Sequence, residues 1–118
     1  MNATARTFLI QVQPDRLVAL DAPDILNMAK RLERDWPEDC SITTGDDAGP
    51  FINIQVHSNT PARTWLRIAD LFLGTDVLSA EVRISSIITM TGDIGWDDYL
   101  LLHHFDPSVE LDPYPRSR

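Results

Sequence analysis

The chain has 118 residues, with 18 acidic and 10 basic side chains that give a formal net charge of −8. This length fits a single domain that can bury its own core without metal or disulfide support. The acidic balance disfavours a general nucleic-acid binder, which needs Lys and Arg to neutralise phosphates, and it disfavours adhesion to anionic membranes.

The cysteine content and the apolar runs bear on the compartment. Cys40 is the single cysteine, so no internal disulfide can form. The first residues lack the apolar run and the small-residue cleavage site of a signal peptide, and no apolar run is long enough to span a membrane. We therefore expect a cytoplasmic protein.

The first half of the chain predicts three strands and a helix. Residues 7–13 alternate apolar and polar side chains, as in a strand with one buried face. Residues 21–24 are typical of a helix start, and Trp36-Pro37 ends this helix because the residue before proline avoids the helical region. Residues 40–44 and 51–58 predict the two strands of a hairpin, joined by a loop at 45–50.

The second half predicts one helix, two strands and a tail. Thr60-Pro61 begins the helix, and Gly74 is expected to end it in the left-handed conformation. Residues 80–91 alternate over the longest stretch and predict a strand, with a bulge or bend near Ser85-Ser86. Residues 96–105 predict a last strand, with a short helix as the alternative, and the proline-containing residues 107–118 predict an extended tail.

This order of elements, β-α-β-β-α-β-β, indicates an α+β fold in a single domain over residues 1–106. Its first six elements match a split β-α-β arrangement. We therefore expect a ferredoxin-like antiparallel sheet with two helices on one face, which satisfies the right-handed crossover rule. A fifth strand is expected to pair with the fourth at the sheet edge.

The negative charge is regional. Residues 35–62 carry five acids and residues 91–112 carry six, with no base in either segment. Together they hold −11, which leaves +3 for the rest of the chain. In the predicted topology the segment 35–39 and the turn 92–95 share one end of the sheet, and the loop 45–50 lies at the other. The first of these ends is expected to gather an acidic cluster that includes Asp35.

These segments supply the candidate binding residues. Tryptophan and tyrosine are over-represented among binding hot spots, and flanking acids favour a basic partner. The candidate partner-binding residues are Trp36, Glu38, Asp39, Asp46, Asp47, Asp93, Trp96, Asp97, Asp98 and Tyr99. The alternative interpretation is a solvated acidic surface that only aids solubility.

Catalytic chemistry finds little support in the sequence. His103 and His104 are adjacent on a predicted strand, so they point to opposite faces and cannot readily share a metal ion. The acidic neighbours of Cys40 would raise its pKa, which disfavours a nucleophile. Adjacent acids such as Asp46-Asp47 lack a phosphate cradle beside them. We predict no enzyme activity, no metal and no cofactor.

By its size, α+β pattern and acidic loops with tryptophans, the chain resembles the immunity proteins of bacterial toxin–immunity pairs, such as contact-dependent growth inhibition systems. The residues that carry this resemblance are Trp36, Asp46-Asp47-Ala48-Gly49-Pro50 and Gly95-Trp96-Asp97-Asp98-Tyr99. The resemblance implies that the chain binds a cationic toxin domain, such as a nuclease, and inhibits it stoichiometrically. No direct contact with nucleic acid or membrane is implied, and the chain would be a monomer or a homodimer. The alternatives are a regulatory or assembly module that dimerises through a sheet edge, and a small metal-dependent enzyme.

Overall fold

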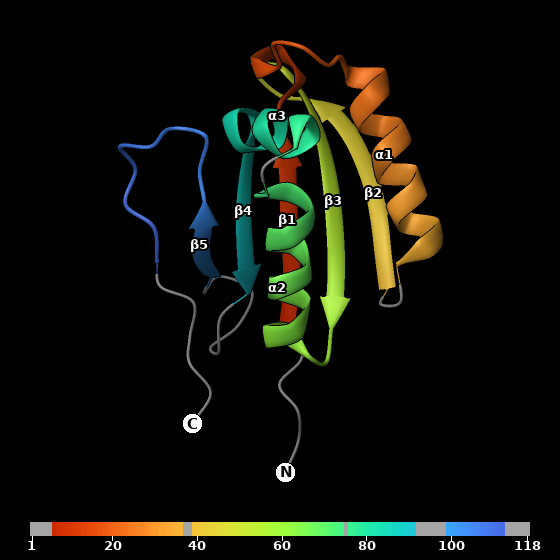
Figure 1. Ribbon diagram of the computed structural model, residues 1–118, viewed down its shortest axis with the longest axis vertical. Helices are drawn as coiled ribbons and strands as arrows, with labels where there is room; N and C mark the ends of the chain where they lie inside the picture. Colours follow the sequence, from red (N-terminus) through yellow and green to blue (C-terminus); the bar gives the residue numbers. More distant parts are fainter. Residues whose placement is uncertain (1–5, 37–38, 75, 92–98, 113–118) are drawn as a thin grey trace.

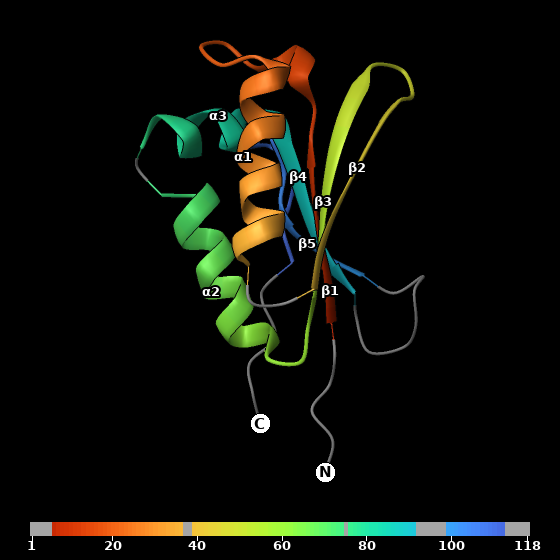
Figure 2. The same cartoon turned by 90° about the vertical axis from the view of Figure 1, so that its right-hand side faces the viewer.

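Five antiparallel strands form one sheet, and the helices pack on one of its faces (Figure 1). The computed structural model describes residues 6–36, 39–74, 76–91 and 99–112. In chain order the elements are β1 (Arg6–Val12), the 3-10 helix η1 (Pro14–Arg16), α1 (Ala22–Asp35), β2 (Asp39–Asp46), β3 (Pro50–Ser58), α2 (Pro61–Phe72), α3 (Val77–Ser85), β4 (Ser86–Thr91) and β5 (Tyr99–His103). Figure 2 shows α1, α2 and α3 on the same side of the sheet.

The strands lie in the order β2-β3-β1-β4-β5, with β1 at the centre. Ile10 of β1 pairs with Ile54 of β3 on one side and with Ile88 of β4 on the other. The predicted fifth strand does pair with the fourth at the sheet edge, and the alternative of a short helix there is wrong. The sheet is therefore a five-stranded antiparallel sheet in an α+β fold.

The start of α1 follows from its sequence. The Asp21 carboxylate accepts the Asp24 N–H at 3.0 Å, and the Asp24 carboxylate accepts the Asp21 N–H at 3.1 Å. This reciprocal pair satisfies two backbone donors that a helix start leaves free. The helix ends before Trp36, whose backbone is extended as its place before proline predicts.

The end of α2 differs from the prediction. Leu73 is the C-cap with φ −122°, and Gly74 is not in the left-handed region. The carbonyl oxygens of Leu73 and Gly74 instead accept the Arg83 guanidinium at 2.6 and 2.8 Å. A Cβ at Gly74 would lie 3.0 Å from the Asp70 carbonyl oxygen, so close packing explains this glycine.

The prediction of one long strand over residues 80–91 is wrong, because its first half is the helix α3. The Asp76 carboxylate caps this helix by accepting the Ser79 N–H at 2.7 Å. Val82 and Ser85 are fully buried at helical spacing, whereas Ile84 is 41% exposed. The strand begins only at Ser86, which pairs with Val12, the last residue of β1. The bulge or bend predicted within a strand near Ser85-Ser86 is instead the junction between α3 and β4, and the register shift of β4 against β5 lies between Ile88 and Thr89.

Glu81 of α3 holds the loop between η1 and α1. Its carboxylate oxygen accepts the backbone N–H groups of Val18, Ala19 and Leu20 at 3.0, 2.8 and 2.8 Å. The hydrogen bond from Leu20, followed by those from Ala19 and Val18, lowers the pKa of this carboxyl group against the opposing effect of desolvation. Only 5% of the residue is exposed, so α3 and the loop are joined by a buried charged contact.

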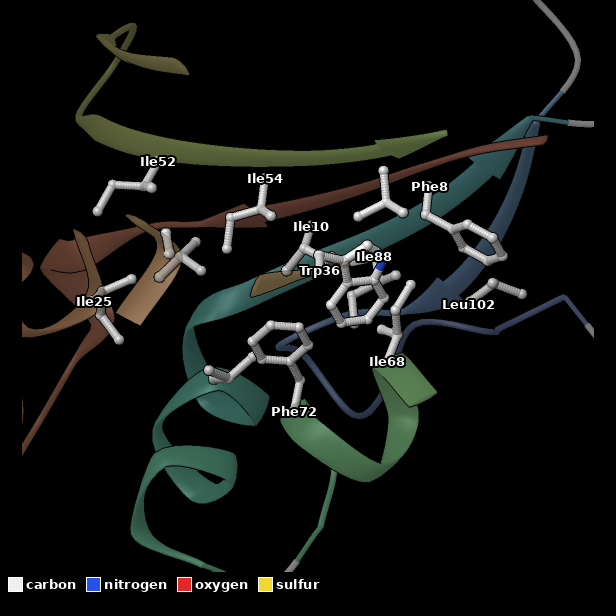
Figure 3. Packing of buried hydrophobic residues seen from close by; sticks show 14 of the residues in the cluster. Phe8, Ile10, Ile25, Trp36, Ile52, Ile54, Ile68, Phe72, Ile88 and Leu102 are labelled. Carbon is white, nitrogen blue, oxygen red and sulfur yellow. The ribbon is translucent and has the colours of Figure 1, made fainter. Parts of the chain in front are cut away.

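The core lies between the helices and one face of the sheet. Phe8, Ile10, Ile54 and Ile88 contribute from the strands, and Phe72 contributes from α2 (Figure 3). All five side chains are at most 1% exposed. The alternation of residues 7–13 and 51–58 therefore correctly identified which of their side chains enter the core.

The last described residues return along the outer edge of the sheet. The Leu101 N–H donates to the Asp112 carboxylate at 2.8 Å, and the Asp112 N–H donates to the Leu101 carbonyl at the same distance. This pair covers part of the free edge of β5. In the described part of the chain, no helix is long and apolar enough to cross a membrane.

Candidate functional site

The end of the β2–β3 hairpin is the best-defined candidate site. Ala48 and Gly49 adopt positive φ values of 57° and 129°, and these values turn the chain between the strands. The Asp46 carboxylate accepts the Gly49 N–H at 3.3 Å, and the Asp47 N–H donates to the Gly49 carbonyl at 2.9 Å. These bonds fix the turn and leave the Asp47 carboxylate exposed.

A cavity of about 650 Å³ lies beside this turn, and we call it the acidic pocket. Residues of β1, η1 and the hairpin line it: Gln11, Gln13, Asp15, Arg16, Asp47, Ala48, Gly49, Pro50 and Phe51. It forms because β1 ends where β3 begins, so η1 follows β1 directly onto the hairpin end. A pocket of this size can accept one or two side chains of a partner.

The acidic pocket carries more negative than positive charge. Asp15 and Asp47 form no ion pair with any described residue. Arg16 is the one base among the described lining residues, and its guanidinium lies 3.5 Å from the centre of the Phe105 ring. The same guanidinium donates to the Gln13 side-chain oxygen at 2.8 Å. Arg16 is therefore held by Phe105 and Gln13, and both carboxylates stay available to an external cation.

Phe51 forms one wall of the acidic pocket and is held against β2. It pairs across the strands with Gly45, and its ring occupies the space that a Cβ on Gly45 would need. Glycine at position 45 therefore leaves room for the Phe51 ring beside the backbone of β2. The prediction of a loop at Gly45 is wrong, because Gly45 is a residue of β2 that makes room for an aromatic side chain.

The described part of the chain does not bring all of the predicted binding residues together. Asp46 and Asp47 lie at the hairpin end, whereas Asp39 lies at the opposite end of β2. Tyr99 begins β5 and is 60% exposed. Because β2 and β5 are the two outer strands of five, Asp39 and Tyr99 are about 19 Å apart at the usual strand spacing. The hairpin end is thus separate from the other described candidates.

Trp36 belongs to the core and not to the exposed surface. It is 9% exposed, and the Arg67 guanidinium lies 5.4 Å from the centre of its ring. Figure 3 shows its indole among the side chains of the core. The indole N–H is buried without a hydrogen-bond partner. Packing in the core accounts for this tryptophan, so we do not include it in the proposed binding surface.

Of the expected acidic cluster near residues 35–39, only Asp35 and Asp39 fall in described segments. The Arg34 guanidinium donates to the Asp35 carboxylate at 3.0 and 3.3 Å, which lowers the pKa of Asp35. Asp35 is thus neutralised from within α1. The remaining candidates lie outside the described residues: Glu38, Asp93, Trp96, Asp97 and Asp98.

The three histidines do not converge. The His103 ring donates from Nε2 to the Arg83 carbonyl at 2.9 Å, and its burial lowers its pKa. His104 accepts the Asp106 N–H at 3.0 Å, and His57 contacts the Thr7 hydroxyl at 2.7 Å on another strand. Among the described residues, no group of three or more potential metal ligands occurs.

Cys40 has the environment of a structural thiol. Its burial, followed by the negative charges of Glu33 and Asp39, raises its pKa to about 11. The effect of Asp39 was predictable from the sequence, whereas the larger effect of burial depends on the fold. A thiol with this pKa is almost entirely protonated at neutral pH, so it is a poor nucleophile.

We expect Cys40 to react slowly with iodoacetamide. At pH 8 the folded protein should be alkylated roughly 200-fold more slowly than free cysteine, because about 0.1% of the Cys40 thiol is ionised against about 24% of a free thiol. Mass spectrometry over time measures this rate, and the protein in denaturant serves as the control, since unfolding removes the burial. Equal rates in the folded and denatured protein would contradict the assigned environment.

Sequence reasoning missed Asp15, which lies outside both base-free segments. The predicted topology could have revealed it. A first strand that runs antiparallel to the second hairpin strand must end beside the hairpin turn, and Asp15 follows this first strand.

Comparison with protein-family models, with curated proteins and with solved structures finds no match to this chain. The candidate site therefore rests on its geometry and charge.

Proposed function

We propose that this protein is a stoichiometric inhibitor of the immunity-protein type, which binds a basic toxin domain such as a nuclease in the acidic pocket. The observation that carries the proposal is the pair of carboxylates, Asp15 and Asp47, in one cavity where, among the described residues, neither forms an ion pair and the one lining base, Arg16, is held by other side chains. Lysine and arginine side chains of a partner complement such a site. On this proposal the protein has no catalytic activity and acts in the cytoplasm.

The strand order supports a finer assignment of the fold. We infer a ferredoxin-like sheet made by β1 to β4, to which β5 and α3 are added. In this arrangement η1 follows the end of β1, and the β2–β3 turn leads into the start of β3 beside it, so the architecture itself supplies the acidic pocket. The open sheet face and the hairpin end are free of the covering helices (Figure 2).

Charge reversal tests the proposal. We expect Asp47→Lys to weaken binding about 10- to 100-fold, because it places a cation where the partner's cation sits. Asp70→Lys makes the same change of charge on the exposed face of α2 and should alter affinity less than about threefold. On this proposal the toxin is encoded beside this protein, so the probe is the protein encoded by the adjacent gene. Calorimetry measures its binding at low and at physiological salt.

Two results would contradict the proposal. One is equal affinity for Asp47→Lys and Asp70→Lys. The other is that the wild-type chain fails to bind this probe at low salt, where attraction between opposite charges is least screened. Binding should also protect cells that express the probe protein, if the partner is a toxin.

A sheet-edge assembly module is the second candidate function. Its support is β2, which is an outer strand of eight residues without proline, and whose charged described residues lie only at its two ends. Such an edge can pair with another strand. Calorimetric dilution of the protein alone separates the two candidates, because an assembly module binds its own copy.

A further inference from the structure

A second cavity, of about 580 Å³, lies on the other side of the hairpin end, and we call it the apolar cleft. One wall comes from the start of α1, including Pro23 and Leu26, and the other from the hairpin, including Pro50 and Ile52. In Figure 2 the end of β2 and the start of β3 lean away from α1. Ile25 and Ile52 are the labelled core residues at this end of the cluster (Figure 3).

The cleft is suited to an apolar group. Its walls are mostly hydrocarbon, and an unpaired polar group buried there would lose hydrogen bonds to water. A cavity of this volume can accept a whole aromatic or long aliphatic side chain. Anchoring pockets of this kind, which exclude water around one large side chain, provide much of the affinity of protein interfaces.

The charge at the mouth of the cleft indicates which partner would fill it. Asp46 is exposed and lines the cleft, so the mouth is negative. Pro50 and Phe51 line both the apolar cleft and the acidic pocket, which are therefore neighbours across one hairpin end. A basic partner that spans the hairpin end can therefore contact Asp47 in the pocket and Asp46 at the cleft together.

We propose that the basic partner inserts an aromatic or long aliphatic side chain into the apolar cleft, next to a lysine or arginine bound in the acidic pocket. The partner then holds the hairpin end from both sides. This inference rests on the proposed function, and it adds the specificity that charge alone cannot provide. Attraction between charges accelerates association, and the apolar anchor slows dissociation.

Two neighbouring residues of β2 provide a matched test. Thr44 lines the cleft, whereas Thr43 does not; both are exposed, and alternation along a strand places their side chains on opposite faces. We expect Thr44→Trp to fill the cleft and to weaken binding of the adjacent-gene protein at least about tenfold. Thr43→Trp should change this affinity less than about threefold. Equal affinities of the two folded variants would overturn the inference while leaving the proposed function intact.

A peptide probe tests the cleft without the partner. N-acetyl-phenylalanyl-arginine amide, added to the ¹⁵N-labelled wild-type protein at about 10 mM, should shift the amide resonances of Leu26, Thr44 and Ile52. The matched probe N-acetyl-glycyl-arginine amide should shift resonances near Asp47 and leave the cleft unchanged. Equal shifts at the cleft residues with both peptides would overturn the inference.

Discussion

Glu81→Gln is expected to lower the melting temperature at pH 7 by roughly 5–10 °C. The substitution keeps the shape of the side chain and removes the negative charge that three backbone N–H groups share. A neutral amide oxygen is a weaker acceptor, and the new amide N–H₂ group would bring donors toward other donors. The loop of residues 17–20 should then loosen from α3, and with it the position of η1.

The pH dependence of the melting temperature shows whether the charge of Glu81 causes the loss of stability. Because the folded pKa of Glu81 lies below its ordinary value, the stabilisation is complete above the unfolded pKa of about 4.3. It is lost as the pH falls through the folded pKa, so the melting temperatures of wild type and variant should converge in acid. Glu33→Gln makes the same change at an exposed position of α1 and should leave the melting temperature nearly unchanged. A constant difference at all pH values would contradict this account.

Val82→Ala is expected to destabilise the protein by about 2–3 kcal/mol, because it leaves a cavity beneath α3 in the core. Ile84→Ala removes more apolar atoms from a residue that is 41% exposed, and it should cost less than about 1 kcal/mol. Urea denaturation of both variants measures the difference. In a strand the two side chains would share one face, so similar losses from both would contradict the helix at this position.

The strands and helix boundaries were predictable where local chemistry agrees with the fold. The alternation of residues 7–13 and 51–58 places Phe8, Ile10 and Ile54 in the core. The reciprocal caps at Asp21 and Asp24 operate within one turn of chain. Such features need no distant partner, so the sequence reveals them.

The helix α3 could not be predicted from its local sequence pattern. Its apolar residues Ala80, Val82 and Ile84 alternate as in a strand, but Ala80 and Ile84 are exposed. The capping residue Asp76 was a local signal for a helix. The deciding contacts are distant in sequence: Glu81 binds a loop about 60 residues earlier, and β1 offers partners only from Ser86 onward.

The candidate site was also predictable only in part. The acids Asp46 and Asp47 were visible as a cluster beside a turn, and a negative site for a basic partner was predicted from them. Asp15 joins them only because β1 is the antiparallel neighbour of β3. Tryptophan is a residue type typical of binding anchors, yet the end of α1 places Trp36 in the core.

The sequence by itself determined the acidic character, the alternating strands, the start of two helices and the concentration of acid in segments without bases. The tertiary structure decided which acids share a cavity, which aromatic side chains are exposed and where the last helix gives way to a strand. The physical reason is how far apart along the chain the interacting residues lie. Alternation, capping and charge are set by neighbours in the chain, whereas cavities and burial depend on residues that only the sheet order brings together.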